Sequence, residues 1–163
     1  MDPDPLQIVV PLLALASSFL SLKIGIFVFL IICSALVSGA EVAFFGLTPT
    51  DINELEKRTE PKASMVLRLL EKPKKLLATI LIANNAINIG IVLLFSDLGN
   101  VLFSGIHYVF FDVISLKFMV EVVLVTFLIL MFGEILPKVY ANRNRLEFAQ
   151  FMSLPIRGLD ILK

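Results

Sequence analysis

Apolar residues dominate three long stretches of the chain, at 24–47, 76–94 and 118–136. Each stretch is close to the roughly 20 apolar residues that a helix needs to cross the hydrocarbon core of a membrane. A soluble protein of this length has too little interior to hide so many apolar side chains. We therefore expect an all-α membrane protein, with three transmembrane helices that form a domain at 24–137.

The composition of the chain supports this membrane assignment. The 163 residues are 58% hydrophobic and 17% charged, whereas soluble domains are about 45–50% apolar and about 25% charged. Basic and acidic residues balance at 14 each, so no basic excess points to a nucleic-acid partner. The single cysteine, Cys33, excludes an internal disulfide framework and a cysteine-based zinc site. The lipid bilayer is the first partner that we expect.

The N-terminal extension at 1–23 is also apolar, but it differs from the three spans. Its apolar run, 6–22, is short for a span, contains Pro11 and is bounded by Lys23. We favour a short helix in the outer leaflet over a fourth complete span. The acidic start of the chain does not match the basic beginning of a cleaved signal peptide.

A polar segment at 48–75 separates the first two apolar stretches. Thr48, Pro49 and Asp51 match the N-cap, the first-position proline and the first-turn acid of a helix. Apolar residues then recur at helical spacing after Pro61. We expect a polar helical hairpin with one face packed on a neighbouring element.

The C-terminal segment at 138–163 mixes apolar and charged positions, which is typical of helices that lie in the membrane interface. We expect these helices to be broken at Pro155. The chain ends with this segment, soon after the third span, and we expect it to be a membrane domain cut from a longer protein.

Basic residues predict the orientation of the spans. Every lysine and arginine except Lys23 and Lys117 lies within 48–75 or 138–163. The positive-inside rule places such segments in the cytoplasm. We therefore expect the hairpin and the C-terminus to be cytoplasmic and the N-terminus to be outside.

Polar side chains occur at a matching depth on all three spans, where lipid makes them costly. On the first span one helical face carries Ser34, Ser38 and Glu41, with Gly39 beside them. On the second span Asn84 and Asn88 share a face, and Asn85 lies about 100° away. A lone asparagine inside a membrane more often bonds a neighbouring helix than an ion.

The third span ends with Gly133, Glu134 and Pro137. Proline lacks an N–H and clashes with the carbonyl of the residue four positions earlier, which is Gly133. We expect a helix break at Pro137 and a free Gly133 carbonyl, which needs water or a cation as a partner. A kink that serves only packing is the alternative.

These polar positions supply hard oxygen donors. They are the hydroxyl of Ser38, the amide oxygens of Asn84 and Asn88, the carboxylate of Glu134 and one or two main-chain carbonyls. Such donors suit Mg²⁺, Ca²⁺ or Na⁺, whereas softer metals need imidazole or thiolate. Glu41 would ligate the ion directly, bind a coupling ion or hold another ligand in place. Two carboxylates, Glu41 and Glu134, would together neutralise one divalent ion. We expect Glu121 to be a charge at the rim of the span or a partner for Lys117, and His107 to be a solvated loop residue.

Three motifs in a fixed order add a family resemblance. They are SGAEVAFF at 38–45, TILIANNAINI at 79–89 and GEILPK at 133–138, with the polar hairpin between the first two. This series resembles the transmembrane domain of the CorC/CNNM magnesium transporters, also called the DUF21 domain. The first motif is also similar to a gliding-motility-associated branch of that family. Ala83 departs from the pattern, which has glycine there.

The resemblance implies a homodimer of three-span protomers in the bacterial inner membrane. It implies export of Mg²⁺ by alternating access in exchange for Na⁺, and a paired cytosolic CBS module that would follow 138–163. The Mg²⁺ ligands carried over by motif are Ser38, Gly39, Asn84, Asn88, Gly133 and Glu134. Supporting or coupling-ion positions are Glu41, Asn85 and Ser34.

A second function uses the same ligands. The domain would be a Mg²⁺-binding sensor or scaffold that moves no ion and acts through cytosolic domains or a partner complex. Measured ion flux separates the two hypotheses. The sequence shows no nucleophile with a base, no phosphate loop and no metal triad with an open position, so we do not expect an enzyme.

Overall fold

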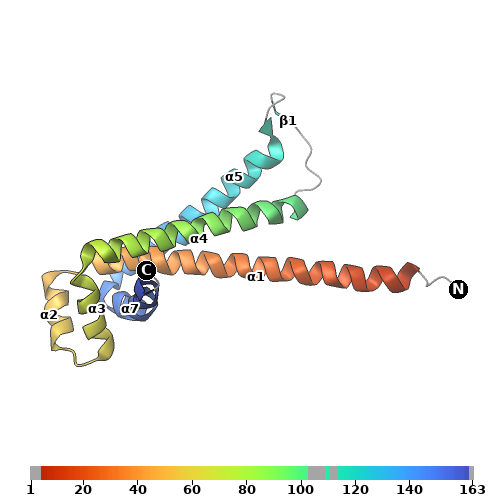
Figure 1. The fold of residues 1–163 in the computed structure, drawn as a ribbon. Coiled ribbons are helices and arrows are strands. Elements are labelled where there is room, and N and C mark those ends of the chain that lie inside the picture. The colour runs from red at the N-terminus through yellow and green to blue at the C-terminus, as the bar shows by residue number, and fades with distance from the viewer. Residues whose placement is uncertain (1–4, 103–108, 111–113, 162–163) are drawn as a thin grey trace.

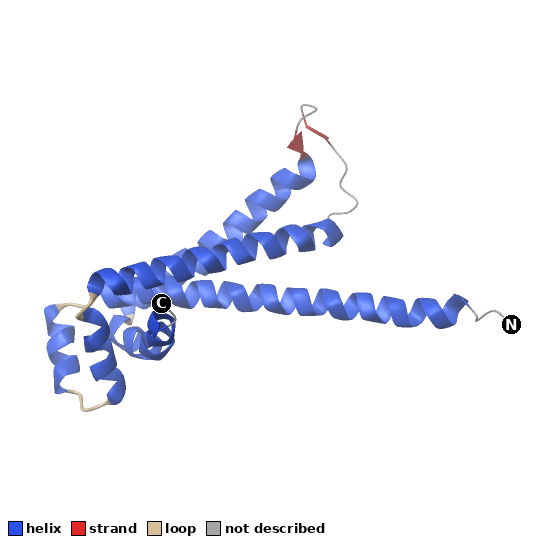
Figure 2. Ribbon diagram, viewed as in Figure 1, coloured by secondary structure: helices blue, strands red, loops and turns tan. Residues whose placement is uncertain are grey.

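The computed structural model describes residues 5–102, 109–110 and 114–161, and almost all of them are helical (Figure 2). The elements in chain order are α1 (Pro5–Phe45), α2 (Pro49–Lys57), α3 (Pro61–Leu70), α4 (Pro73–Leu102), β1 (Val109–Phe110), β2 (Ile114–Ser115), α5 (Leu116–Leu128), the π-helical segment η1 (Ile129–Ile135), α6 (Leu136–Arg143) and α7 (Arg145–Ile161). The two short strands pair in antiparallel fashion between the second and third spans.

Three segments are long and apolar enough to cross a membrane. They are Ser18–Phe45 within α1, Pro73–Leu102, and Leu116–Arg143, which runs through α5, η1 and α6. The predicted all-α fold with three transmembrane helices is therefore confirmed. Most of the helices extend past the predicted apolar stretches, because a helix continues into polar sequence after it leaves the hydrocarbon core.

Helix α1 joins the N-terminal extension to the first span without a break at Lys23. Its 41 residues extend about 60 Å, which is about twice the hydrocarbon thickness, and Figure 1 shows α1 reaching well beyond the end of α4. Lys23 does not end the helix, and its ammonium pairs with Asp97 of α4 at 2.6 Å. A position in the outer leaflet stays a prediction for this extension.

The segment between the first two spans forms the two helices α2 and α3. The side chain of Thr48 accepts a hydrogen bond from the Asp51 N–H, and the Asp51 carboxylate accepts one from the Thr48 N–H at 2.8 Å. This capping box confirms the predicted helix start. Leu55, Ala63 and Val66 are fully buried, so the hairpin presents a packed face, and α3 lies against α7.

The predicted break at Pro155 is wrong, because α7 continues through it from Arg145 to Ile161. Proline removes one helical hydrogen bond. Met152 and Ser153 before it and Ile156 after it are nevertheless buried, and their packing holds the helix together across that gap.

The interior of the protein is concentrated at the hairpin end of the spans. A large cluster of buried side chains draws on α1, α2, α3, α4, α6 and α7, whereas a smaller cluster of Ile91, Phe95, Val125 and Ile129 lies further along the spans. Beyond the smaller cluster α4 and α5 diverge (Figure 1). Phe29, Leu93 and Val123 are more than 60% exposed, as expected for side chains that face lipid.

Candidate functional site

A chain of hydrogen bonds connects polar side chains from all three spans. The Ser34 hydroxyl donates to Asn88 Oδ1 at 2.7 Å, and Asn88 Nδ2 donates to Glu134 Oε1 at 3.4 Å. Ser34 is fully buried, and Asn88 and Glu134 are half-buried. The structure therefore brings α1, α4 and η1 together at residues that the sequence had singled out.

Ser38 and Asn84 lie one helical turn from this chain of bonds, toward the hairpin. Helices α1 and α4 run in opposite directions (Figure 1), so the position four after Ser34 and the position four before Asn88 fall at the same level. Ser38 Oγ and Asn84 Oδ1 are both buried, and neither has a hydrogen-bond partner among the residues that the structure describes. A buried polar atom without a partner costs about 1–3 kcal/mol, and a cation would remove that cost.

The π-helical segment η1 carries Gly133 and Glu134. Such segments occur frequently at functional sites. A Cβ atom on Gly133 would lie 2.9 Å from Ser34 Oγ. Glycine at this position therefore lets η1 approach α1 closely, next to Glu134.

Pro137 changes the helix type rather than ending the helix, which corrects the predicted break. The chain continues from η1 directly into α6. The Leu136 N–H donates to the Met131 carbonyl, five residues back. Pro137 has no N–H to donate, and the chain nevertheless stays helical on both sides of it. A free Gly133 carbonyl remains a prediction.

Glu41 forms an ion pair with a residue outside this cluster. Its Oε2 is 3.3 Å from Lys138 Nζ, so an ion pair links α1 to α6. The structure thus gives Glu41 a protein counter-ion and brings one carboxylate, Glu134, into the cluster instead of two. Among the residues that the structure describes, no three His, Cys, Asp or Glu side chains gather as a metal site.

One residue of the predicted ligand set, Gly39, and one of the predicted supporting positions, Asn85, have other surroundings. A Cβ on Gly39 would lie 2.7 Å from the ring of Phe148, so the missing side chain of Gly39 makes room for α7. Asn85 is exposed on α4. The structure therefore does not bring these two residues to the cluster.

The far ends of the spans are connected by polar pairs. Lys117 lies 3.7 Å from Glu121, which confirms the predicted pair, and it also donates to Asn100 Oδ1 at 2.8 Å. Sequence reasoning missed the pairs of Lys23 with Asp97 and of Lys138 with Glu41. The sequence did contain one signal for these pairs, because each pair consists of opposite charges near the same end of neighbouring spans. His107 lies outside the described residues.

The donor set has a defined chemical preference. It consists of the hydroxyls of Ser34 and Ser38, the amide oxygens of Asn84 and Asn88, and the Glu134 carboxylate. All are hard oxygen ligands, which favour Mg²⁺, Ca²⁺ or Na⁺ over soft metals. The residues present fit a dehydrated or partly hydrated hard cation.

Comparisons with known proteins agree with the motif pattern. Residues 25–162 match the family model of the cyclin M transmembrane N-terminal domain. A UPF0053 protein of Haemophilus influenzae is 31% identical over 131 residues, which cover 78% of this chain and 29% of that protein. The UPF0053 inner membrane protein YfjD of Escherichia coli is 29% identical over 137 residues, which cover 79% of this chain and 28% of that protein. The chain thus spans less than a third of either relative.

Proposed function

Because this chain belongs to the cyclin M transmembrane N-terminal domain family, we propose that it is the membrane domain of a transporter that exports Mg²⁺. The observation that carries the proposal is the pair of buried oxygens without partners, Ser38 Oγ and Asn84 Oδ1. They lie one helical turn from the hydrogen bond between Asn88 and Glu134, which joins α4 to the third span. A bound cation supplies the partner that these oxygens lack.

The single carboxylate of the cluster is compatible with magnesium. Mg²⁺ dehydrates reluctantly and is usually held by one or two carboxylates while it keeps several waters. In the proposed site Glu134 supplies the charge, and Ser38, Asn84 and Asn88 supply neutral oxygens. Ser34 orients Asn88 through its hydrogen bond at 2.7 Å.

Transport further requires that the site opens to each side of the membrane in turn. The pairs of Lys23 with Asp97 and of Lys117 with Asn100 join the spans at the ends away from the hairpin, which the proposal places on the outer side. In the proposed cycle they break when the site opens outward. Sodium entry drives export, and the functional unit is a homodimer in the bacterial inner membrane whose longer chain carries a cytosolic CBS pair.

Calorimetry and flux test this proposal together. The purified chain is titrated with Mg²⁺ at fixed Na⁺ and again without Na⁺, in the wild type and in Asn84→Ala. Vesicles that contain the same proteins, loaded with a Mg²⁺-sensitive dye, then report ion movement under a Na⁺ gradient.

We expect saturable binding and Na⁺-dependent flux in the wild type, with both lost in Asn84→Ala. Binding without flux would contradict transport and favour the sensor or scaffold. Absence of binding in a folded wild type would contradict the site itself.

A further inference from the structure

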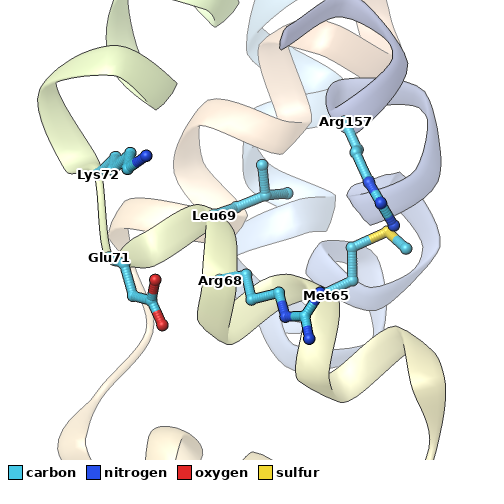
Figure 3. Close-up of a pocket in the computed structure, with 6 residues that line it drawn as sticks. All are labelled: Met65, Arg68, Leu69, Glu71, Lys72 and Arg157. Carbon is cyan, nitrogen blue, oxygen red and sulfur yellow. The ribbon is translucent and has the colours of Figure 1, made fainter. Parts of the chain in front are cut away.

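A pocket of about 320 Å³ lies between α3 and α7, away from the polar cluster of the spans. It is lined by Met65, Arg68, Leu69, Glu71, Lys72 and Arg157. Figure 3 shows Arg157 extending from α7 and Arg68 extending from α3, with the apolar side chains of Met65 and Leu69 on the α3 side. The pocket therefore combines cations with an apolar surface.

The pocket carries a net positive charge. Three of its lining residues are cations and one, Glu71, is an anion. Among the side chains that the structure describes, Arg68, Lys72 and Arg157 form no ion pair with a carboxylate. Two guanidinium groups that line one pocket from different helices are suited to a phosphate group, which they bind through paired N–H donors.

The pocket also lies where a spanning helix begins. A smaller cavity of about 30 Å³ shares Arg68, Leu69 and Lys72 with it and adds Lys75 and Leu76. These last two residues belong to the start of α4, whose span begins at Pro73. Leu77 and Leu81, exposed by 37% and 41%, follow along α4. Along the chain, the cations of the pocket are thus followed by exposed apolar side chains of a spanning helix.

We propose that the pocket between α3 and α7 binds the headgroup of an anionic phospholipid. The phosphate lies between Arg68 and Arg157, Lys72 adds a third cation, and the acyl chains run along α4. Basic pockets at the cytoplasmic ends of spans bind such headgroups by charge attraction. The apolar part of the lining favours a lipid over a free phosphate ion, which has no apolar part.

The test measures lipid preference in the reconstituted chain. Lipid nanodiscs of phosphatidylcholine with increasing phosphatidylglycerol are prepared, and native mass spectrometry counts the phosphatidylglycerol retained by the protein. The wild type is expected to prefer phosphatidylglycerol. The double variant Arg68→Gln with Arg157→Gln is expected to lose about fivefold in relative association for each cation removed. No preference in the wild type, or full preference in the double variant, would overturn the proposal.

A matched control removes two cations outside the pocket. Lys57→Gln with Lys62→Gln changes the same amount of charge at exposed positions of the hairpin and is expected to leave the preference within twofold of the wild type. An equal loss in this control would assign the effect to general surface charge and overturn the pocket. Glu71→Gln is expected to strengthen the preference, and a weaker preference in that variant would also contradict the site.

Two additions distinguish the source of the phosphate and separate this proposal from the transport function. Inorganic phosphate at millimolar concentration is expected to leave the retained lipid unchanged, and displacement would show a site for soluble anions instead. The arginine double variant is expected to bind Mg²⁺ as the wild type does. Loss of lipid preference with intact Mg²⁺ binding supports the headgroup site whether or not the chain transports an ion.

Discussion

Glu41 of α1 and Glu134 of η1 are both glutamates within spanning segments, yet their surroundings differ. Glu41 Oε2 lies 3.3 Å from Lys138 Nζ, in an ion pair that joins α1 to α6. Glu134 faces the neutral amide of Asn88, near two buried oxygens that have no partner. A carboxylate that is paired with a lysine is already neutralised, and the pair holds two helices together. A carboxylate among neutral donors keeps its charge available for a cation.

The two glycines beside these glutamates show the same contrast. Gly39 makes room for the ring of Phe148, whereas Gly133 makes room for the hydroxyl of Ser34. The first allows α7 to pack against α1, and the second brings η1 to the polar cluster. Gly39 and Glu41 of the first motif are thus structural, whereas Ser38 of that motif and Glu134 of the third motif belong to the candidate site.

The same substitution at the two glutamates gives the largest expected difference. Glu134→Gln should weaken Mg²⁺ binding by about 100-fold or more, because one charge interaction in a partly dehydrated site is worth several kcal/mol. Glu41→Gln should change Mg²⁺ affinity by less than about threefold, because Glu41 is not a ligand in the proposed site. Its half-exposed ion pair with Lys138 contributes only about 0–1 kcal/mol to stability. Isothermal titration of both variants checks this, and equal losses would remove the distinction.

Alanine at the two glycines separates packing from ligand placement. Gly39→Ala pushes against Phe148 and should lower the free energy of unfolding by about 1–3 kcal/mol, with Mg²⁺ affinity kept in the protein that folds. Gly133→Ala displaces Ser34 and should weaken Mg²⁺ binding. Thermal unfolding and titration of both variants measure the two effects. A Gly133→Ala variant with unchanged affinity would place the ion elsewhere.

Removing the Ser38 hydroxyl, which lacks a hydrogen-bond partner, should affect protein stability in opposite directions with and without Mg²⁺. Ser38→Ala should raise the stability of the ion-free protein by about 1 kcal/mol, because a buried hydroxyl without a partner is lost. It should also reduce the stabilisation that Mg²⁺ provides. Melting temperatures measured with and without Mg²⁺ test this. A lower melting temperature in the ion-free variant would mean that Ser38 already has a partner.

The smallest expected effect lies in the hairpin, away from both glutamates. Hydrogen bonds from the Thr48 backbone N–H and side chain lower the pKa of Asp51. This stabilisation is complete above the ordinary carboxyl pKa and is lost as pH falls through the lowered value. Asp51→Asn should remove that pH dependence and cost about 0.5–1 kcal/mol. Amide hydrogen exchange in α2 against pH measures it, with Asp97→Asn as a control outside the hairpin.

Local sequence signals predicted much of this structure. Apolar length predicted the three spans, residue types at 48–51 predicted the helix cap, and four-residue spacing predicted the shared faces of Ser34 with Ser38 and of Asn84 with Asn88. The remaining features depend on contacts between distant segments. Examples are Phe148 against Gly39, Lys138 beside Glu41 and the packing that carries α7 through Pro155. No local pattern specifies such partners.

The most direct test of the account is the position of a bound ion. Mn²⁺ prefers the same oxygen ligands as Mg²⁺, and its anomalous scattering locates it in crystals of the protein. The account predicts one peak among Ser38, Asn84, Asn88 and Glu134, which disappears in Glu134→Gln and remains in Glu41→Gln. A peak beside Glu41 and Lys138, or no peak between the spans, would contradict it.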